Sequence, residues 1–234
     1  MPKMNKTDQR RGGFYWLDKI PYVSVTQVLS IIDKPQLRYW FGKQVYYAMV
    51  KDPTLKEQEA LSAPYKTTEK AAERGTTVHS IVESYKHTKK HIDGIPDKYR
   101  GYAHAFYSWV EDNQAELLEH ERTVVSKQHG FAGTLDLLAK LGDKIFVIDI
   151  KTGKDIYPEA FLQLSAYQYA LAEEGTVTDG TGVCLLMENG SYKFAEGRQE
   201  LKPFLAAKAL WEWKNKEQME IFKVYRKGGD LNGR

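Results

Sequence analysis

The two runs of residues on either side of Gly142 and Asp143 restrict the fold of this chain more than any other feature. Apolar residues alternate with others through residues 131–141 and again through residues 144–151. This period of two is typical of strands in a sheet. Gly-Asp between two such runs predicts a two-residue hairpin turn. The segment therefore predicts an antiparallel strand pair whose register is set by the turn.

That register brings two acidic residues together. Around a turn at 142 and 143, paired residue numbers add up to 285, which pairs Asp136 with Asp149. Like charges directly opposite one another are destabilising, so a positive group is expected between them. Lys151 lies two residues beyond Asp149 and therefore on the same face. The opposite face carries a set of apolar residues expected to face the core: Leu135, Leu137, Phe146, Ile148 and Ile150.

Two carboxylates held together on a sheet offer the hard oxygen ligands that suit Mg²⁺ or Mn²⁺. Such an ion activates water and screens a phosphate, and Lys151 would supply further positive charge. The alternative is a surface ladder in which Lys151 only neutralises an exposed acidic pair. The shared face, the register and the apolar reverse side favour the metal site.

The amino-terminal part is predicted to be a hairpin over residues 14–23, a short helix over 26–32 and a longer helix from Pro35 to about Asp52. Residues 53–73 are polar and predict short helical pieces that form a mobile flap or insertion. Apolar residues recur at helical spacing in the longer helix and are expected to face the core rather than to stack on nucleic-acid bases. They are Leu37, Tyr39, Trp40, Val45, Tyr46 and Met49.

The rest of the chain alternates helices with strands. Gly75 to Thr77 predict a helix break and a hydroxyl cap, followed by a helix that ends near His91. Further expected elements are helices over about 98–119, 157–174 and 200–224, a strand over 123–126, and a hairpin over 182–195 that turns at Asn189 and Gly190. This order predicts an α/β fold with a mixed sheet.

Composition excludes several kinds of site. Lys and Arg number 34 against 31 Asp and Glu, a net charge of +3 that suits a polyanionic partner without establishing one. The single cysteine, Cys184, rules out a disulfide framework, a multi-cysteine zinc site and an iron-sulfur cluster, and is expected to be a buried packing residue. We expect no membrane span and no secretory signal, and a basic, flexible arm at residues 1–13.

Four short motifs resemble those of the PD-(D/E)XK nuclease superfamily, and specifically its RecB-like exonuclease branch, which includes phage exonucleases. They occur in the family's order: Arg74 to His79, Gly133 to Asp136, Asp149 to Gly153, and Gln163 to Tyr167. Residues 22–29 are also similar to an amino-terminal segment of mitochondrial genome maintenance exonuclease-like proteins. The resemblance implies a restriction-endonuclease-like core with helical amino-terminal and carboxy-terminal additions. Its expected parts are an arm (1–13), a hairpin and helical region (14–73), the nuclease core (74–200), and a helix with a basic tail (201–234).

The resemblance also implies roles for the motif residues. Asp136, Asp149, His79 and the backbone carbonyl of Ile150 would bind the divalent ion, while Lys151 would position the attacking water and stabilise charge on the phosphate. Glu83, one helical turn after His79, would add a further carboxylate, although a plain surface glutamate explains it almost as well.

The same resemblance places two residues of the last motif at the edge of the site. Gln163 and Tyr167 would orient Lys151 or the scissile phosphate, with helix packing as the alternative for both. Arg74, Thr152 and Lys154 would contact DNA phosphates, with simple solvation as the alternative.

The expected activity is therefore Mg²⁺- or Mn²⁺-dependent hydrolysis of DNA, by an exonuclease acting on single-stranded DNA or DNA ends in replication, repair or recombination. A replication or recombination protein is an expected partner, and the cytoplasm of a bacterial or phage-infected cell is favoured over the mitochondrial matrix. A clamp on DNA is expected from the amino-terminal helices and the carboxy-terminal residues Lys214, Lys216, Lys223, Arg226 and Lys227. Two alternatives remain open: a structure- or sequence-selective endonuclease with the same site, and a non-catalytic DNA-binding module that assists recombination.

Overall fold

The computed structural model describes residues 9–11, 13–85, 92, 94–197 and 200–226. Its strands are β1 (Gln9–Arg11), β2 (Phe14–Leu17), β3 (Ile20–Ser24), β4 (Glu116–Ser126), β5 (Phe131–Leu141), β6 (Lys144–Lys151), β7 (Gly180–Leu186) and β8 (Tyr192–Glu196). Its helices are α1 (Val25–Leu29), α2 (Pro35–Lys51), α3 (Glu57–Glu83), α4 (Asp97–Asp112), α5 (Pro158–Glu173), α6 (Leu201–Lys214) and α7 (Lys216–Arg226).

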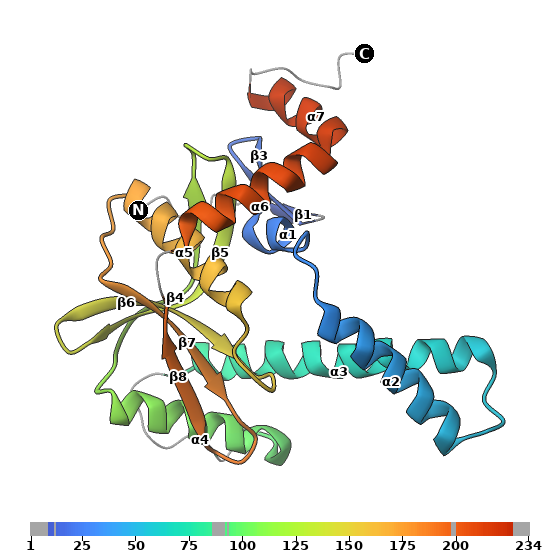
Figure 1. Ribbon diagram of the computed structural model, residues 1–234. Coiled ribbons are helices and arrows are strands. Elements are labelled where there is room, and N and C mark those ends of the chain that lie inside the picture. Colours follow the sequence, from blue (N-terminus) through green and yellow to red (C-terminus); the bar gives the residue numbers. More distant parts are fainter. Residues whose placement is uncertain (1–8, 12, 86–91, 93, 198–199, 227–234) are drawn as a thin grey trace.

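The strands form one eight-stranded mixed sheet with helices on both faces (Figure 1). The order is β1-β2-β3-β5-β6-β7-β8, and β4 pairs with β5. The β3–β5 and β6–β7 pairs are parallel and the others antiparallel. One core lies between the sheet and α1, α5 and α6, and a second lies between the sheet, the end of α3, and α4. The predicted α/β fold with a mixed sheet between helices is confirmed.

The central hairpin has the predicted register. Residues of β5 and β6 pair from Leu137 with Ile148 to Leu141 with Lys144. Gly142 turns the chain with φ +60°, a left-handed conformation that glycine adopts without steric cost. The next positions outward from the turn are Asp136 and Asp149, and the amide of Ile150 there donates to the Asp136 carboxylate instead of continuing the ladder.

One edge of β5 is shared between two strands, and this opens a gap in the sheet. Its other edge is occupied by β4 along most of its length. On the shared edge, β3 pairs only with Phe131 and Ala132, and β6 pairs from Leu137 onward. The backbone of residues 133–136 lies between these two pairings and pairs with neither β3 nor β6. A side chain from the Gly133 to Asp136 motif therefore has room to face a ligand.

The β4–β5 pair changes direction at the same point. Its pairing is recorded for His120 with Leu137 and for Arg122 with Leu135, while Glu121 between them has φ +46°. A left-handed non-glycine residue in a strand costs about 1 kcal/mol or more. Leu135 packs in the core under α5, whereas Leu137 packs in the core next to α4. The prediction that Leu135 shares a face with Leu137, Phe146, Ile148 and Ile150 is wrong, because the strand bends here.

Two predictions about the amino-terminal helices are wrong. The apolar residues of α2 do not face a core: none of the α2 side chains is buried. Residues 57–83 form one helix, α3, not short pieces followed by a break. Gly75 continues the helix, and the hydroxyl of Thr77 donates to the carbonyl of Glu73 inside it rather than capping a new start. The end predicted near His91 lies outside the described residues, and α3 ends at Glu83.

Other boundaries also differ from prediction. The helix expected to reach residue 119 ends at Asp112, because Gln114 adopts φ +49°, and Glu116 then begins β4. The single helix expected over 200–224 is two helices that meet at Asn215, whose side chain caps the carbonyl of Trp211. In the arm expected at 1–13, residues 9–11 form β1, while residues 1–8 and 12 lie outside the described part.

Over the residues that the structure describes, no helix is long and apolar enough to cross a membrane.

Candidate metal and phosphate site

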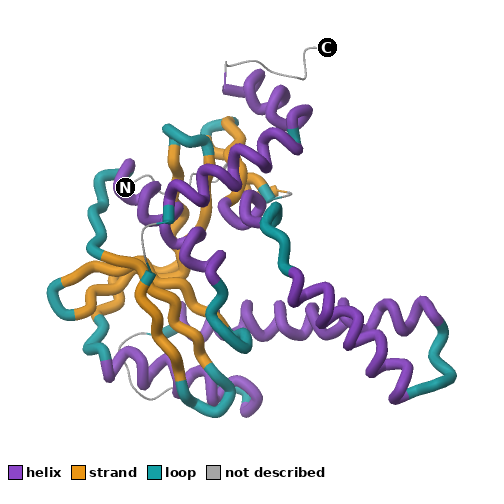
Figure 2. The backbone as a smooth tube through the Cα atoms, in the orientation of Figure 1, coloured by secondary structure: helices purple, strands orange, loops and turns teal. Residues whose placement is uncertain are grey.

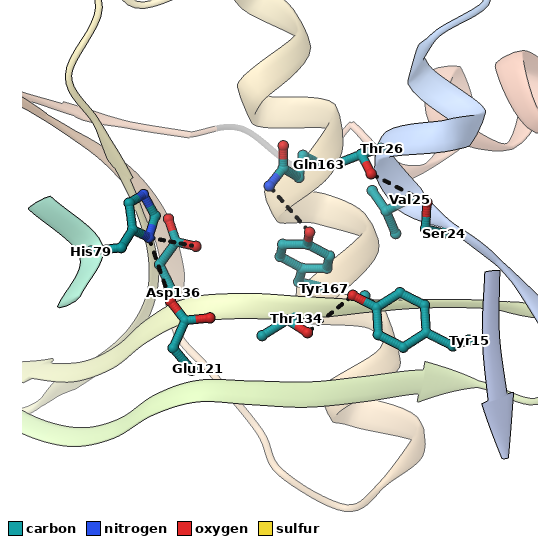
Figure 3. Close-up of a pocket in the computed structure, with 11 residues that line it drawn as sticks. Tyr15, Ser24, Val25, Thr26, His79, Glu121, Thr134, Asp136, Gln163 and Tyr167 are labelled. Carbon is teal, nitrogen blue, oxygen red and sulfur yellow. Dashed lines mark hydrogen bonds and ion pairs between the residues drawn. The ribbon is translucent and has the colours of Figure 1, made fainter. Parts of the chain in front are cut away.

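Three elements that are distant in the sequence place acidic and imidazole groups together. His79 comes from the last turns of α3, Glu121 from the left-handed position in β4, and Asp136 from the bend of β5. One nitrogen or oxygen atom from each residue lies within 4.8 Å of the others. The group lies at one end of a cavity of about 180 Å³ that is lined by residues of β2, β3, α1, α3, β4, β5 and α5 (Figure 3).

The imidazole of His79 is held in a defined orientation. Its Nε2 lies 3.2 Å from the carbonyl oxygen of Ile150. Its Nδ1 faces the two carboxylates, 3.4 Å from Oε1 of Glu121 and 3.6 Å from Oδ1 of Asp136. Burial alone would lower the pKa of His79, but the hydrogen bond to Glu121 and the charges of Asp136 and Glu121 together raise it. The Nδ1 position therefore favours a cation.

The environment of Asp136 disfavours the charged form of its carboxyl group. Its pKa rises to about 7, first because burial disfavours the charged form and second because Asp149 adds a negative charge nearby. His79, Lys151 and the Ile150 amide, 2.7 Å from Oδ2, act in the opposite direction but do not compensate. A cation bound beside Asp136 would stabilise its charged form.

Asp149, Lys151, Gln163 and Tyr167 form a connected network beside this group. Nζ of Lys151 lies 2.7 Å from Oδ1 and 2.6 Å from Oδ2 of Asp149, whose side chain is 2% exposed. Nε2 of Gln163 donates to Oδ1 of Asp149 and to the hydroxyl of Tyr167, at 3.1 Å in both cases. The network fixes the position of Asp149 from two sides.

The charge of Lys151 is maintained by the carboxylates. Burial works against its ammonium group, yet the charges of Asp149 and Asp136 and the hydrogen bond to Asp149 outweigh this and raise its pKa. The ammonium group is therefore a fixed positive charge next to two acids, as the pleat of β6 predicted.

Glu121 was missed by sequence reasoning. The sequence pattern predicts a helix up to about residue 119 and a strand only from Thr123. A signal was available, because a strand that pairs Ser126 with Phe131 also places Glu121 opposite Asp136 if it is extended. The left-handed conformation that aims this carboxylate toward His79 had no signal in the sequence.

Hydroxyl groups line the other end of the cavity, away from the carboxylates (Figure 3). The Tyr15 hydroxyl lies 3.0 Å from Oγ1 of Thr134, and Oγ of Ser24 lies 3.2 Å from Oγ1 of Thr26. These residues come from β2, β5 and the β3–α1 junction, which the parallel β3–β5 pair brings together. Neutral hydroxyls can donate hydrogen bonds to the oxygens of a phosphodiester.

Gly133 is needed for space rather than for a turn. A Cβ atom at Gly133 would lie 2.2 Å from Cε1 of Tyr167. The ring of Tyr167 is 3% exposed and packs directly over the β5 backbone. The glycine of the second motif thus makes room for the tyrosine of the fourth.

Seven site residues named from the sequence are not among those lining this cavity. Three of them are Asp149, Ile150 and Lys151 of β6, whose contacts are given above, and the others are Glu83, Lys154, Thr152 and Arg74. Glu83 is exposed at the end of α3, and Lys154 is exposed after β6. Thr152 is half-buried directly beyond Lys151. Arg74 lies on α3 ahead of His79, and its buried Nε has no hydrogen-bond partner among the described residues. Cys184 is buried in β7, as expected, and burial raises the pKa of its thiol.

The donor set fits a divalent metal ion. Carboxylate oxygens from two residues and one imidazole nitrogen converge, and Asp149 adds a buried acid beside them. Mg²⁺ and Mn²⁺ favour oxygen-rich ligand sets, and Mn²⁺ also accepts imidazole. The acids Glu121, Asp136 and Asp149 outnumber the ammonium group of Lys151 and the imidazole of His79, and a divalent ion would neutralise the excess negative charge.

Comparisons with known proteins agree with this chemistry. The sequence model of the PD-(D/E)XK nuclease superfamily matches residues 54–219, which is most of the chain. A comparison with curated proteins finds no match.

Among solved structures, the chain is similar to LHK-Exo, an alkaline exonuclease from Laribacter hongkongensis, with a TM-score of 0.46, 12% identity, and coverage of 88% of this chain and 93% of that one. LHK-Exo in complex with dAMP gives a TM-score of 0.45 at 12% identity, with the same coverage. SSO0001 gives 0.35 at 16% identity, covering 79% of this chain and 72% of that one.

Proposed function

Since the chain belongs to the PD-(D/E)XK nuclease superfamily, we propose that it is a DNA exonuclease that depends on Mg²⁺ or Mn²⁺. The observation that carries the proposal is the convergence of His79, Glu121 and Asp136 in one cavity, with Asp149 and Lys151 beside them. Exonuclease activity on single-stranded DNA or DNA ends is supported by the order of the four motifs, which resembles the RecB-like branch.

The metal-binding residues of the proposal are Asp136, Asp149, His79 and the carbonyl of Ile150, with Glu121 added from the structure. When bound, the ion polarises the phosphate and activates water for attack on phosphorus. Glu121 lies on β4 and His79 lies on α3. The metal site therefore forms only when α3 has packed against the sheet. Glu83 has no part in this proposal, because it lies outside the group.

Lys151 is assigned the role of holding positive charge beside the phosphate. Its ammonium group is bound to Asp149 and stays protonated, so it can stabilise the negative charge that develops on the phosphate oxygens. Gln163 holds Asp149 in place and Tyr167 supports Gln163, so both are positioning residues. The hydroxyls of Tyr15, Ser24, Thr26 and Thr134 would bind a neighbouring phosphate or sugar.

The test is digestion of linear and circular DNA, single-stranded and duplex, with either end labelled and with Mg²⁺, Mn²⁺ or EDTA. An exonuclease releases mononucleotides or short products from one labelled end and leaves circles intact. Lys151→Ala should lower the rate by at least about a hundredfold, since one charge-stabilising group in a desolvated site contributes that much. Asp143→Asn, which changes an exposed acid in the turn of the same hairpin, is the matched control and should act as wild type.

Cleavage of circles would establish the endonuclease alternative. Binding without cleavage in every metal, with Lys151→Ala equal to the parent, would establish the non-catalytic alternative. Roles in replication, repair or recombination, and a protein partner in those processes, are part of the proposal and would be tested by capture of partners with an inactive variant.

A further inference from the structure

The α2 helix and the first half of α3 project from the body as a helical hairpin (Figures 1 and 2). One face of α2 packs on α3. Phe41, Val45 and Ala48 on this face are half-buried, and the Phe41 ring lies edge-on to Tyr65 with centroids 5.6 Å apart. In the part of the chain that the structure describes, α2 packs mainly against α3.

The opposite face of α2 is aromatic and exposed. Tyr39, Lys43, Tyr46, Tyr47 and Val50 recur at spacings of three and four residues, which places them on one side of the helix, and we call them the tyrosine stripe. Tyr39 is 70% exposed, Tyr46 63% and Tyr47 52%. Nζ of Lys43 lies 5.4 Å from the Tyr39 ring centre and 5.9 Å from that of Tyr47. Exposed apolar residues gathered on one side of an element are typical of binding surfaces.

The charge of α2 indicates the chemistry of the partner. Between Pro35 and Lys51 the helix contains Arg38, Lys43 and Lys51, and neither aspartate nor glutamate. Arg38 is ion-paired with Asp33, so the cation within the stripe is Lys43, which lies over the rings of Tyr39 and Tyr47. Bases of single-stranded nucleic acid stack on exposed rings, and a phosphate pairs with such a cation.

We propose that the tyrosine stripe is a stacking platform for single-stranded DNA whose strand continues to the cavity at His79. This inference rests on the proposed function, because it requires that the cavity binds a polynucleotide. It reverses the expectation that these aromatic residues are core, since they are left exposed on the projecting hairpin.

The continuous α3 helix sets the distance between platform and cavity. Phe41 lies against Tyr65 and the two helices run antiparallel, so Tyr46 lies level with about residue 60 of α3. From there to His79 is about 19 residues, or about 28 Å along the helix axis. At about 3.4 Å per stacked nucleotide, this corresponds to about eight nucleotides. Only strands longer than this can occupy both places.

Binding is measured without catalysis, by fluorescence anisotropy of a labelled single strand of about 20 nucleotides in EDTA at low salt. Tyr39→Ser, Tyr46→Ser and Tyr47→Ser should each weaken binding by about fivefold or more, as loss of a stacked ring does. These side chains are exposed, so circular-dichroism melting should show an unchanged fold. In the presence of Mn²⁺, the variants should raise KM on the long strand and leave cleavage of an oligonucleotide of about four nucleotides unchanged.

Met49→Ser is the matched control. Met49 is 52% exposed on the same helix, as Tyr47 is, but it does not share the side of α2 that carries the tyrosine stripe. The proposal expects no change in DNA affinity in this variant. Equal weakening by Met49→Ser, or unchanged affinity in all three tyrosine variants, would overturn it.

A further measurement distinguishes DNA from a second copy of the chain as the ligand of the tyrosine stripe. If the tyrosine variants convert an oligomer to a monomer, measured by sedimentation, while DNA affinity is unchanged, the stripe is an interface between copies and the proposal is wrong. Because the assay reads binding in EDTA, failure of the platform is distinct from failure of the nuclease assignment. A protein that binds through the stripe but never cleaves would support the platform and refute only the nuclease.

Discussion

Replacing Gly133 with alanine is expected to destabilise the protein and disturb its site at once. The added Cβ would lie 2.2 Å from Cε1, 3.0 Å from Cζ and 3.2 Å from Cδ1 of Tyr167. Carbon atoms prefer about 3.5–4.0 Å, so the ring or the strand must move by more than about 1 Å. Neither moves easily, because Tyr167 is 3% exposed and Gly133 is in a strand paired with β4.

The expected cost is about 2–3 kcal/mol, in the upper part of the range for overpacked cores. For a chain of this length, that lowers Tm by about 4–12 °C. The displaced ring also withdraws the acceptor that holds Gln163 beside Asp149, so nuclease activity should fall more than stability explains.

Thermal melting of the variant and a double-mutant cycle test this reasoning. In the Tyr167→Leu background the ring is gone, and Gly133→Ala should then cost less than about 1 kcal/mol. Gly75→Ala is the control: it lies inside α3 with no atom within 4 Å of the added Cβ, and should stabilise by about 0.5–1 kcal/mol. A Gly133→Ala protein that melts with wild type, or an equal cost in both backgrounds, would refute the steric explanation.

Three further predictions concern the charged groups of the cavity. Glu121→Gly should relieve the strain of the left-handed backbone and raise Tm in EDTA. The same change should weaken Mn²⁺ binding, measured by calorimetry, by at least about tenfold. Unchanged Mn²⁺ affinity would show that Glu121 is not a ligand. Asp136 keeps its proton up to about pH 7 when folded but only to about 3.8 when unfolded, so without metal the folded state binds more protons and stability should fall as pH rises from about 4 to 7. The raised pKa of His79 also makes stability fall as pH rises, but from about pH 6.5 upward. Chemical denaturation of Asp136→Asn between about pH 4 and 7 should show a smaller slope than the parent. Gln163→Leu, which frees one side of Asp149, should lower kcat by about tenfold or more with little change in KM, and equal effects on both would show that Gln163 binds substrate instead.

Local features of the sequence were sufficient to predict the β5–β6 hairpin at the centre of the molecule and the residues that it brings together. The turn at Gly142 set the β5–β6 register, and that register placed Asp136, Asp149 and Lys151 together before any tertiary contact was considered. Such a prediction succeeds because pairing across a two-residue turn is determined by residues close together in the chain.

Features that depend on contacts between residues far apart in the chain could not be predicted from the sequence. The carboxylate of Glu121 reaches the site only because β4 pairs with β5 and the backbone takes a left-handed conformation there. The hydroxyl end of the cavity exists because β3 joins β5 in parallel.

The exposure of Tyr39 and Tyr46 depends on what packs against each face of α2. Helical periodicity shows that apolar residues share a side of a helix, but not whether another element covers that side. Sequence by itself therefore determined the paired strands and their acids, since turn geometry is local. Tertiary structure alone decided the third acid and the exposed aromatic face, because burial and strand pairing depend on elements far apart in the chain.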